Sequence, residues 1–222
     1  MKSLITIILL LPATLFSQTE WGNWLMYFGT NKVSDNWSIH SEVQYRNHTV
    51  APTNVEQLLL RTGVNYHLKS GNAMATAGYG YVANHEFESP QKNAEVNEHR
   101  IFEQFILNNY AGRVKFEHRY RVEQRWVNSV YKNRFRYRLM LFIPLNKPVI
   151  EKGSLFLGLY DEVFLNTRAT FFDRNRLYGA LGYQFSKATS LQIGVLQQQV
   201  STAGKFHLQF GLTFNPNLTK KK

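Results

Sequence analysis

The chain has 222 residues, the size of a single domain, and 14% of them are aromatic. Cysteine is absent, which excludes disulfides, thiolate chemistry and zinc sites built from cysteine. The formal charge of +11 is compatible with nucleic acid or anionic lipid as a partner, so the position of the charges along the chain has to decide between these classes.

Residues 1–18 have the pattern of a signal peptide. Lys2 forms a short positive region, residues 4–11 are apolar, Pro12 ends the apolar run, and Ser17 is a small residue suited to a cleavage site. The apolar run is too short to span a bilayer. We therefore expect a segment that directs export through the Sec pathway and is then removed. The rest of the chain has no second apolar stretch of the length that a transmembrane helix needs.

After residue 18 the chain reads as strands separated by turn signals, and no segment shows an apolar stripe with a period of 3.6 residues. The predicted strands are 21–30, 37–48, 56–68, 72–84, 98–109, 113–126, 134–143, 153–165, 174–185, 190–199 and 205–214. An exported chain that crosses a membrane with strands must close into a barrel, because lipid cannot satisfy an open sheet edge. The predicted fold is an all-β, antiparallel up-and-down transmembrane barrel of ten to twelve strands over residues 19–215, followed by a basic tail, 216–222.

The segment 113–126 alternates without a break between charged and mostly apolar residues. Side chains in a strand alternate between two faces, so one face of this strand carries only charge. Such a face fits a barrel with lipid outside and a polar lumen inside, and the segment 134–143 continues it with three arginines. The predicted lumen charge network is Arg113, Lys115, Glu117, Arg119, Arg121, Glu123, Arg125, Arg134, Arg136 and Arg138.

The connections between the predicted strands alternate in length. The short ones are 69–72, 110–112 and 186–190, and the longer ones are 85–97 and 166–173. Outer-membrane barrels have short periplasmic turns and long extracellular loops, so we expect the longer connections outside. Single-chain bacterial barrels have an even number of strands, whereas eleven segments are found here. Either segment 21–30 is not a full strand, which gives ten, or one strand is missed, which gives twelve.

Two interpretations of the charged lumen remain open. Side chains fill the interior of small barrels, and Arg–carboxylate pairs are well suited to that role. Alternatively, the excess of arginine over glutamate attracts a small anionic solute. Nucleic acid is not expected as a partner, because the charges would lie inside the barrel and no groove for stacking single strands is apparent.

No metal, cofactor or catalytic site follows from the sequence pattern. The seven histidines are scattered, and none has the spacing of a metal-binding motif. A barrel enzyme could use Ser38, Ser41, Ser129 or His85, but nothing in their spacing selects them. Catalytic residues therefore stay unassigned, and no cofactor is expected.

Several motifs of the chain together resemble a known family. They are Trp24, Trp37, Arg61-Thr-Gly-Val-Asn-Tyr66, Gly78-Tyr79, Glu98-His-Arg100, the run from His118 to Arg125, Arg134-Phe-Arg-Tyr-Arg138, Glu162 and Asn175-Arg-Leu-Tyr-Gly179. This succession resembles bacterial outer-membrane β-barrel proteins, common in Bacteroidetes, that are catalogued as a domain of unknown function. The resemblance implies a place in the outer membrane of a Gram-negative cell and supplies no activity, substrate or catalytic residue.

The predicted surroundings are outer-membrane lipid, with the barrel-assembly machinery as a partner during biogenesis. The last strand ends in Phe214, which is similar to the signal that this machinery reads. We expect a structural barrel or a narrow, porin-like channel for a small anionic solute. The alternatives are a lipase- or protease-like barrel enzyme acting at the extracellular rim, and an adhesion or assembly partner that acts through residues 85–97.

Overall fold

The computed structural model describes residues 21–85, 95–167, 170–201 and 203–219, so the predicted signal peptide and most of the 85–97 connection lie outside the described residues. The strands are β1 (Gly22–Lys32), β2 (Trp37–Asn47), β3 (Val55–His67), β4 (Ala73–His85), β5 (Glu95–Ala111), β6 (Val114–Val127), β7 (Val130–Pro144), β8 (Leu155–Asn166), β9 (Phe172–Gln184), β10 (Thr189–Val200) and β11 (Ala203–Phe214). In this part of the chain, no helix has the length and apolar character needed to cross a bilayer.

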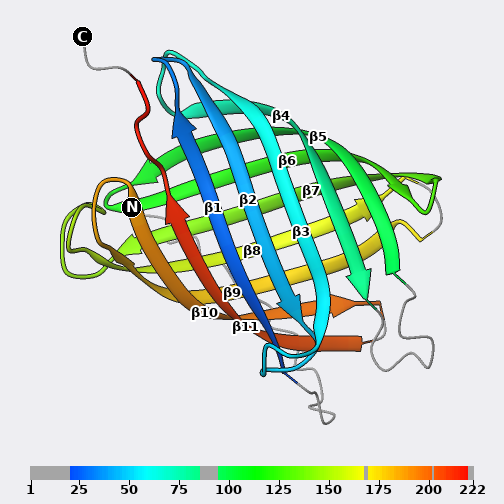
Figure 1. The fold of residues 1–222 in the computed structure, drawn as a ribbon. Coiled ribbons are helices and arrows are strands. Elements are labelled where there is room, and N and C mark those ends of the chain that lie inside the picture. The colour runs from blue at the N-terminus through cyan, green and yellow to red at the C-terminus, as the bar shows by residue number, and fades with distance from the viewer. Residues whose placement is uncertain (1–20, 86–94, 168–169, 202, 220–222) are drawn as a thin grey trace, which may run out of the picture.

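The eleven strands form one closed barrel in which each strand pairs with its neighbours in the sequence (Figure 1). Ten pairs are antiparallel, while β1 and β11 close the barrel in parallel, with Gly22 opposite His207 and Phe28 opposite Thr213. The prediction of an all-β barrel is confirmed. The expectation of an even strand number is wrong, because segment 21–30 is a full strand and no further strand is present among the described residues. With an odd number of up-and-down strands, the first and last run in the same direction, so their pairing is parallel.

The barrel has two rims, which we name the N-terminal rim, where β1 begins, and the C-terminal rim, where β11 ends. The C-terminal rim carries the connections 33–36, 68–72, 112–113, 145–154 and 185–188 and residues 215–219. The N-terminal rim carries Trp21 and the connections that include 48–54 and 128–129. Figure 1 shows the chain leaving the C-terminal rim beside the ends of β1 and β11.

Loop length does not separate the two rims as strictly as predicted. The connection 145–154 is long but lies on the rim of the short turns. The turn between β6 and β7 is tight but lies on the N-terminal rim, where Asn128 and Ser129 take positive φ values of 45° and 68°. This compact turn uses the left-handed conformation that asparagine tolerates better than most residues.

The interior of the barrel is polar and the exterior is apolar. Among the described residues, 22 of the buried side chains are polar or charged and 13 are hydrophobic. On β7, Arg134 and Arg136 are buried while Phe135 between them is exposed. The alternation predicted from the sequence thus places charge in the lumen and apolar side chains outside.

Candidate functional site

All ten residues of the predicted charge network lie on the lumen side of β6 and β7 or in the turn before β6. Seven line a cavity in the lumen: Arg113, Lys115, Glu117, Arg119, Arg121, Arg136 and Arg138. The other three, Glu123, Arg125 and Arg134, lie nearer the N-terminal rim and make ion pairs there. Arg113 stands apart at the C-terminal rim, since it makes no ion pair within the described part of the chain.

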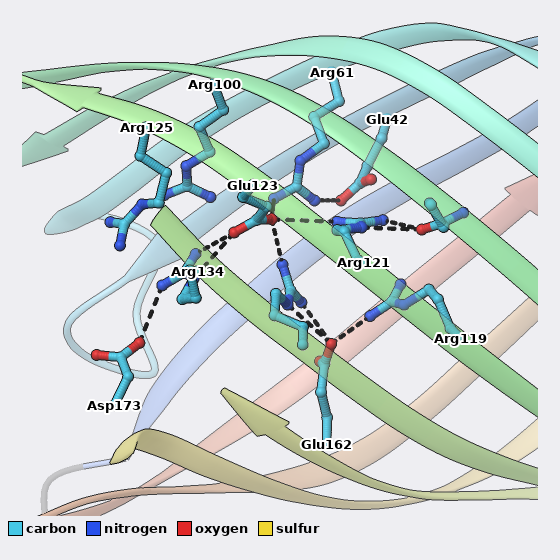
Figure 2. A network of polar contacts seen from close by, with 12 residues as sticks. Glu42, Arg61, Arg100, Arg119, Arg121, Glu123, Arg125, Arg134, Glu162 and Asp173 are labelled. Carbon is cyan, nitrogen blue, oxygen red and sulfur yellow. Dashed lines mark hydrogen bonds and ion pairs between the residues drawn. The ribbon is translucent and has the colours of Figure 1, made fainter. Parts of the chain in front are cut away.

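Glu123 is the centre of an ion-pair network and has an exposed fraction of 0% (Figure 2). Its Oε2 accepts hydrogen bonds from Nε and Nη2 of Arg134 at 3.0 and 2.6 Å. Its Oε1 accepts one from Nη1 of Arg136 at 2.8 Å and lies 3.5 Å from Nη2 of Arg61 and 3.7 Å from Nη1 of Arg121. Four guanidinium groups from three strands thus surround one carboxylate, which makes its complete burial tolerable.

Glu162 of β8 is a second centre of the same network. Arg136 donates Nε and Nη2 to Oε1 of Glu162 at 3.0 and 2.7 Å, and Arg119 donates Nη2 to the same oxygen at 2.6 Å. Arg136 therefore bridges Glu123 and Glu162 and ties β6 to β8 through the lumen. Charge-assisted bonds of this multiple kind are among the strongest hydrogen bonds in proteins.

Further ion pairs add residues from three other strands, β2, β5 and β9. These pairs are Asp173 with Arg134 at 3.1 Å, Glu98 with Arg100 and Arg125, and Glu42 with Arg61 at 2.8 Å. The predicted network omitted Glu42, Arg61 and Asp173. The alternation in 37–48 places Glu42 on the polar face and could have identified it, but no sequence pattern indicates that it meets Arg61.

Aromatic rings hold several of these guanidinium groups in place. The Cζ atoms of Arg136 and Arg176 lie 4.3 and 4.7 Å from the ring centroid of Phe164. Those of Arg46 and Arg176 lie 4.0 and 4.8 Å from the ring of Trp24. Neither Arg46 nor Arg176 forms an ion pair among the described residues, and both donate to glutamine side chains instead. Desolvated cation–π contacts of this kind contribute up to about 2 kcal/mol each.

A cavity of about 660 Å³ occupies the lumen between the ion-pair network and the C-terminal rim. Arg61, Arg136 and Glu162 line its inner end, while Val149 of the 145–154 connection and Asn215 line its outer end. Glu123, which lies deeper, does not contribute to the lining. The network therefore borders the cavity on the side of the N-terminal rim. A volume of this size is typical of small-molecule sites.

Basic side chains dominate the charges around this lumen cavity. Nine basic residues line it (Arg46, Arg61, Arg113, Lys115, Arg119, Arg121, Arg136, Arg138 and Arg176), against three acidic ones (Glu42, Glu117 and Glu162). The buried carboxylate of Glu123 behind the lining compensates part of this excess. A cavity with low-dielectric walls and one dominant sign of charge concentrates ions of the opposite sign, here anions.

The lumen cavity also has an apolar wall, which the sequence analysis did not identify. It is formed by Met26, Phe28, Met140, Phe142, Phe156, Tyr160 and Tyr178. The signal was present in the alternation, since Met140 and Phe142 continue the inward face of β7 beyond Arg138.

Two polar residues of β5 lie on the outer face of the barrel. Glu103 on β5 is exposed and accepts a hydrogen bond from Nε2 of Gln124 at 3.2 Å. The ring of His99 lies 2.5 Å from the hydroxyl of Tyr79, an exposed residue. Both occupy odd positions on β5, whereas the inward positions of this strand are even.

A serine–histidine pair is present at the C-terminal rim. Oγ of Ser38 lies 2.8 Å from Nε2 of His67 and accepts a hydrogen bond from Nδ2 of Asn65 at 2.9 Å. Ser38 has no exposed surface and lines no described cavity, and no acidic residue orients His67 among the described residues. The pair therefore lacks the access and the third partner that a nucleophile requires. In the described ranges, no group of histidine, aspartate and glutamate residues could hold a metal ion.

The comparisons with known proteins give one match. The model of the family described as "Protein of unknown function (DUF2490)" matches residues 21–209, from the start of β1 into β11. No curated protein and no solved structure matches the chain. The description of the family states no activity, so the function has to be inferred from the geometry of the barrel.

Proposed function

We propose that this chain, which belongs to the family described as protein of unknown function (DUF2490), is an outer-membrane β-barrel whose lumen takes up small anionic solutes. The solute enters at the C-terminal rim, and the ion-pair network closes the lumen toward the N-terminal rim. One observation carries this proposal: nine basic and three acidic side chains line a cavity inside a barrel with an apolar exterior.

The outer surface supports the membrane location. Every strand exposes at least one large hydrophobic side chain, among them Leu25, Val43, Leu60, Tyr79, Ile101, Tyr120, Phe135, Leu159, Leu181, Ile193 and Phe210. Monomeric soluble proteins rarely expose an apolar surface that is continuous around the molecule. A bilayer would cover this surface on all sides, as it does for barrels with apolar-out, polar-in strands.

Aromatic pairs near both rims support the same location. Trp37 packs against Tyr66 near the C-terminal rim with ring centroids 4.9 Å apart. Trp126 packs against Tyr131 near the N-terminal rim at 5.3 Å. Tryptophan and tyrosine favour the two membrane–water interfaces. A strand of twelve residues is about 40 Å long. With a tilt of about 40° from the barrel axis, it extends about 30 Å along that axis, which is enough for the apolar band of an outer-membrane barrel.

The membrane location can be tested with arginine on the two faces of the barrel. Leu139→Arg places a charge on the outer face and should destabilise the refolded protein in vesicles by about 2–4 kcal/mol if it lies near the midplane. Gln192→Arg, which faces the lumen cavity, is the control and should cost much less. Equal costs in urea unfolding would contradict the membrane location.

The proposed closure of the lumen can be tested by removing part of the ion-pair network without changing the net charge of the protein. In Glu123→Ala/Arg136→Ala, Arg134 keeps Asp173, Arg61 keeps Glu42 and Glu162 keeps Arg119. We expect this variant to conduct in planar bilayers with a preference for anions. The intact protein should conduct far less, because the network closes its lumen.

The control for this experiment is Glu117→Ala/Arg138→Ala, which removes a neutral pair from the wall of the lumen cavity. It should leave the conductance at the level of the intact protein, since the cavity is already open there. A folded Glu123→Ala/Arg136→Ala variant without conductance, or with a preference for cations, would overturn the proposal that the network closes a lumen that admits anions.

A further inference from the structure

The inward side chains of several strands change character along the strand. On β7, Arg134, Arg136 and Arg138 are followed by Met140 and Phe142 toward the C-terminal rim. On β8, Phe164 and Glu162 are followed by Tyr160 and Phe156, and on β9 Arg176 is followed by Tyr178 and Ala180. The cavity therefore has its arginines at the inner end and an apolar wall nearer the opening.

The strand β6 does not follow this change. It presents Lys115, Glu117 and Arg119 to the same part of the lumen, so a charged stripe faces the cavity beside the apolar wall. Nζ of Lys115 lies 5.2 Å from the ring centroid of Phe142, where stripe and wall meet. The cavity is consequently amphipathic in cross-section as well as along its length.

Two arginines have unused donors here, Arg119 of the stripe and Arg138 opposite it on β7. Arg119 gives only Nη2 to Glu162, and Arg138 gives only Nη2 to Glu117, both at 2.6 Å. Their Nε atoms are buried and have no hydrogen-bond partner among the described residues. Their side chains retain 11% and 16% exposure, and both residues line the cavity. Buried donors without a partner are costly, so a bound acceptor would stabilise both groups.

A third unpartnered donor lies in the same cavity. Nε1 of Trp24 is buried without a hydrogen-bond partner, and this side chain has an exposed fraction of 2%. Trp24 packs with Met26 and Tyr178 in the apolar cluster, so its indole lies where the apolar wall meets the arginines. The site thus offers positive charge and unfilled donors beside an apolar surface.

We propose that the ligand of the lumen cavity is an amphiphilic organic anion, specifically a single-chain monocarboxylate. The carboxylate binds Arg119 and Arg138, and the hydrocarbon chain lies along Met140, Phe142 and Phe156. This inference rests on the proposed anion-binding lumen and adds the substrate class. A small inorganic anion would leave the apolar wall in contact with water, whereas a hydrocarbon chain removes that surface from water.

The position of Trp24 provides a direct measurement. The chain has four tryptophans, and Trp24 lines the cavity whereas Trp21 and Trp37 are exposed. A full-length variant with Trp21→Phe, Trp37→Phe and Trp126→Phe keeps Trp24 as its single fluorophore. In lipid nanodiscs, 2-bromoundecanoate should quench Trp24 saturably, because bromine quenches indole at short range and this bromine lies beside the carboxylate, at the end of the cavity where Trp24 meets the arginines. The trimethylammonium analogue with the same brominated chain should not quench saturably.

The dependence on chain length measures the contribution of the apolar wall. Unbrominated monocarboxylates should compete with 2-bromoundecanoate, and each methylene buried should raise the affinity about fourfold. Arg119→Gln and Arg138→Gln should each weaken binding at least tenfold. Lys132→Gln, an exposed cation on β7 outside the cavity, is the matched control and should leave the affinity unchanged.

The outcomes separate the two proposals. If acetate and inorganic phosphate compete as well as the long monocarboxylates do, the anion-binding lumen stands and the amphiphilic ligand is wrong. If the ammonium analogue binds as tightly as the carboxylate, the assignment of the head group is wrong. If no anion of any chain length affects Trp24, and planar bilayers show no preference for anions, both proposals fail.

Discussion

The two halves of the lumen are built from the same strands but differ in how their inward side chains are used. In the half near the N-terminal rim, carboxylates and guanidiniums neutralise each other around Glu123, which does not line the lumen cavity. In the half near the C-terminal rim, a cavity of about 660 Å³ lies between a charged stripe and an apolar wall. The first half closes the barrel, while the second leaves space, basic charge and unused donors for a ligand.

The contrast shows that buried charge has different meanings in the two halves. A buried ion pair often adds little net stability, because desolvation offsets the attraction, but loss of one partner leaves an uncompensated charge. The network half is therefore expected to be sensitive to every single substitution. The cavity half should tolerate substitution, because water or a ligand in the cavity can replace a lost contact.

The largest expected effect comes from the centre of the network. Glu123→Gln leaves Arg134, Arg136 and Arg61 without one of their partners, and should lower the free energy of unfolding by about 3–5 kcal/mol. Glu117→Gln, the same change in the cavity half, should cost about 1 kcal/mol, because its side chain is partly exposed to the cavity. Urea unfolding in vesicles measures both, and similar costs would remove the distinction between the halves.

A smaller effect is expected from adding one methyl group to each half. A Cβ at Gly78 would lie 2.5 Å from the backbone oxygen of Thr62 and 2.6 Å from Cζ of Phe102, which packs in the network half. Gly78→Ala should therefore cost about 1–3 kcal/mol, as overpacked cores do. At Gly182, the three atoms nearest to an added Cβ all belong to the ring of Phe156.

Because Phe156 borders the cavity, its ring can move aside, and Gly182→Ala should cost less than about 1 kcal/mol. The same unfolding assay compares both alanine variants. A cost for Gly182→Ala equal to that for Gly78→Ala would show that the wall around the cavity is as rigid as the network.

The smallest difference is expected for phenylalanine. Phe164→Leu keeps an apolar side chain but removes the ring that Arg136 and Arg176 overlie, so it should cost about 1–2 kcal/mol. Phe156→Leu in the cavity half has no such cation and should cost less than about 1 kcal/mol. Thermal unfolding measures the loss of stability in both variants. A larger loss for Phe156→Leu than for Phe164→Leu would contradict the cation–π contribution.

Most of the strand pattern could be predicted, because it depends on local geometry. The predicted strand 37–48 differs from β2 by one residue at one end, and 113–126 differs from β6 by one residue at each end. The inward face of β6 was also identified, since side chains in a strand alternate with period two. Residues 86–94 of the predicted connection and the signal peptide lie outside the described residues, so these expectations remain predictions, whereas residues 85 and 95–97 belong to β4 and β5.

The partners of the lumen residues could not be predicted in the same way. Arg61 and Glu123 are separated by more than sixty residues and lie 3.5 Å apart only because β3 and β6 curve around one lumen. Arg136 was predicted as a lumen residue, but its bridge between Glu123 and Glu162 depends on the stagger of three strands. The apolar wall needed the same information, because Phe142 and Phe156 come together only across β7 and β8.

The sequence by itself determined the all-β class, the positions of the strands and which side chains face the lumen. These features follow from a period of two along each backbone, which is a local property. Tertiary structure decided the parallel closure of β1 on β11, the odd strand number, the pairing of charges in one half and the open space in the other. The reason is that closure and stagger are set by all strands together, and only they determine which inward side chains meet across the lumen.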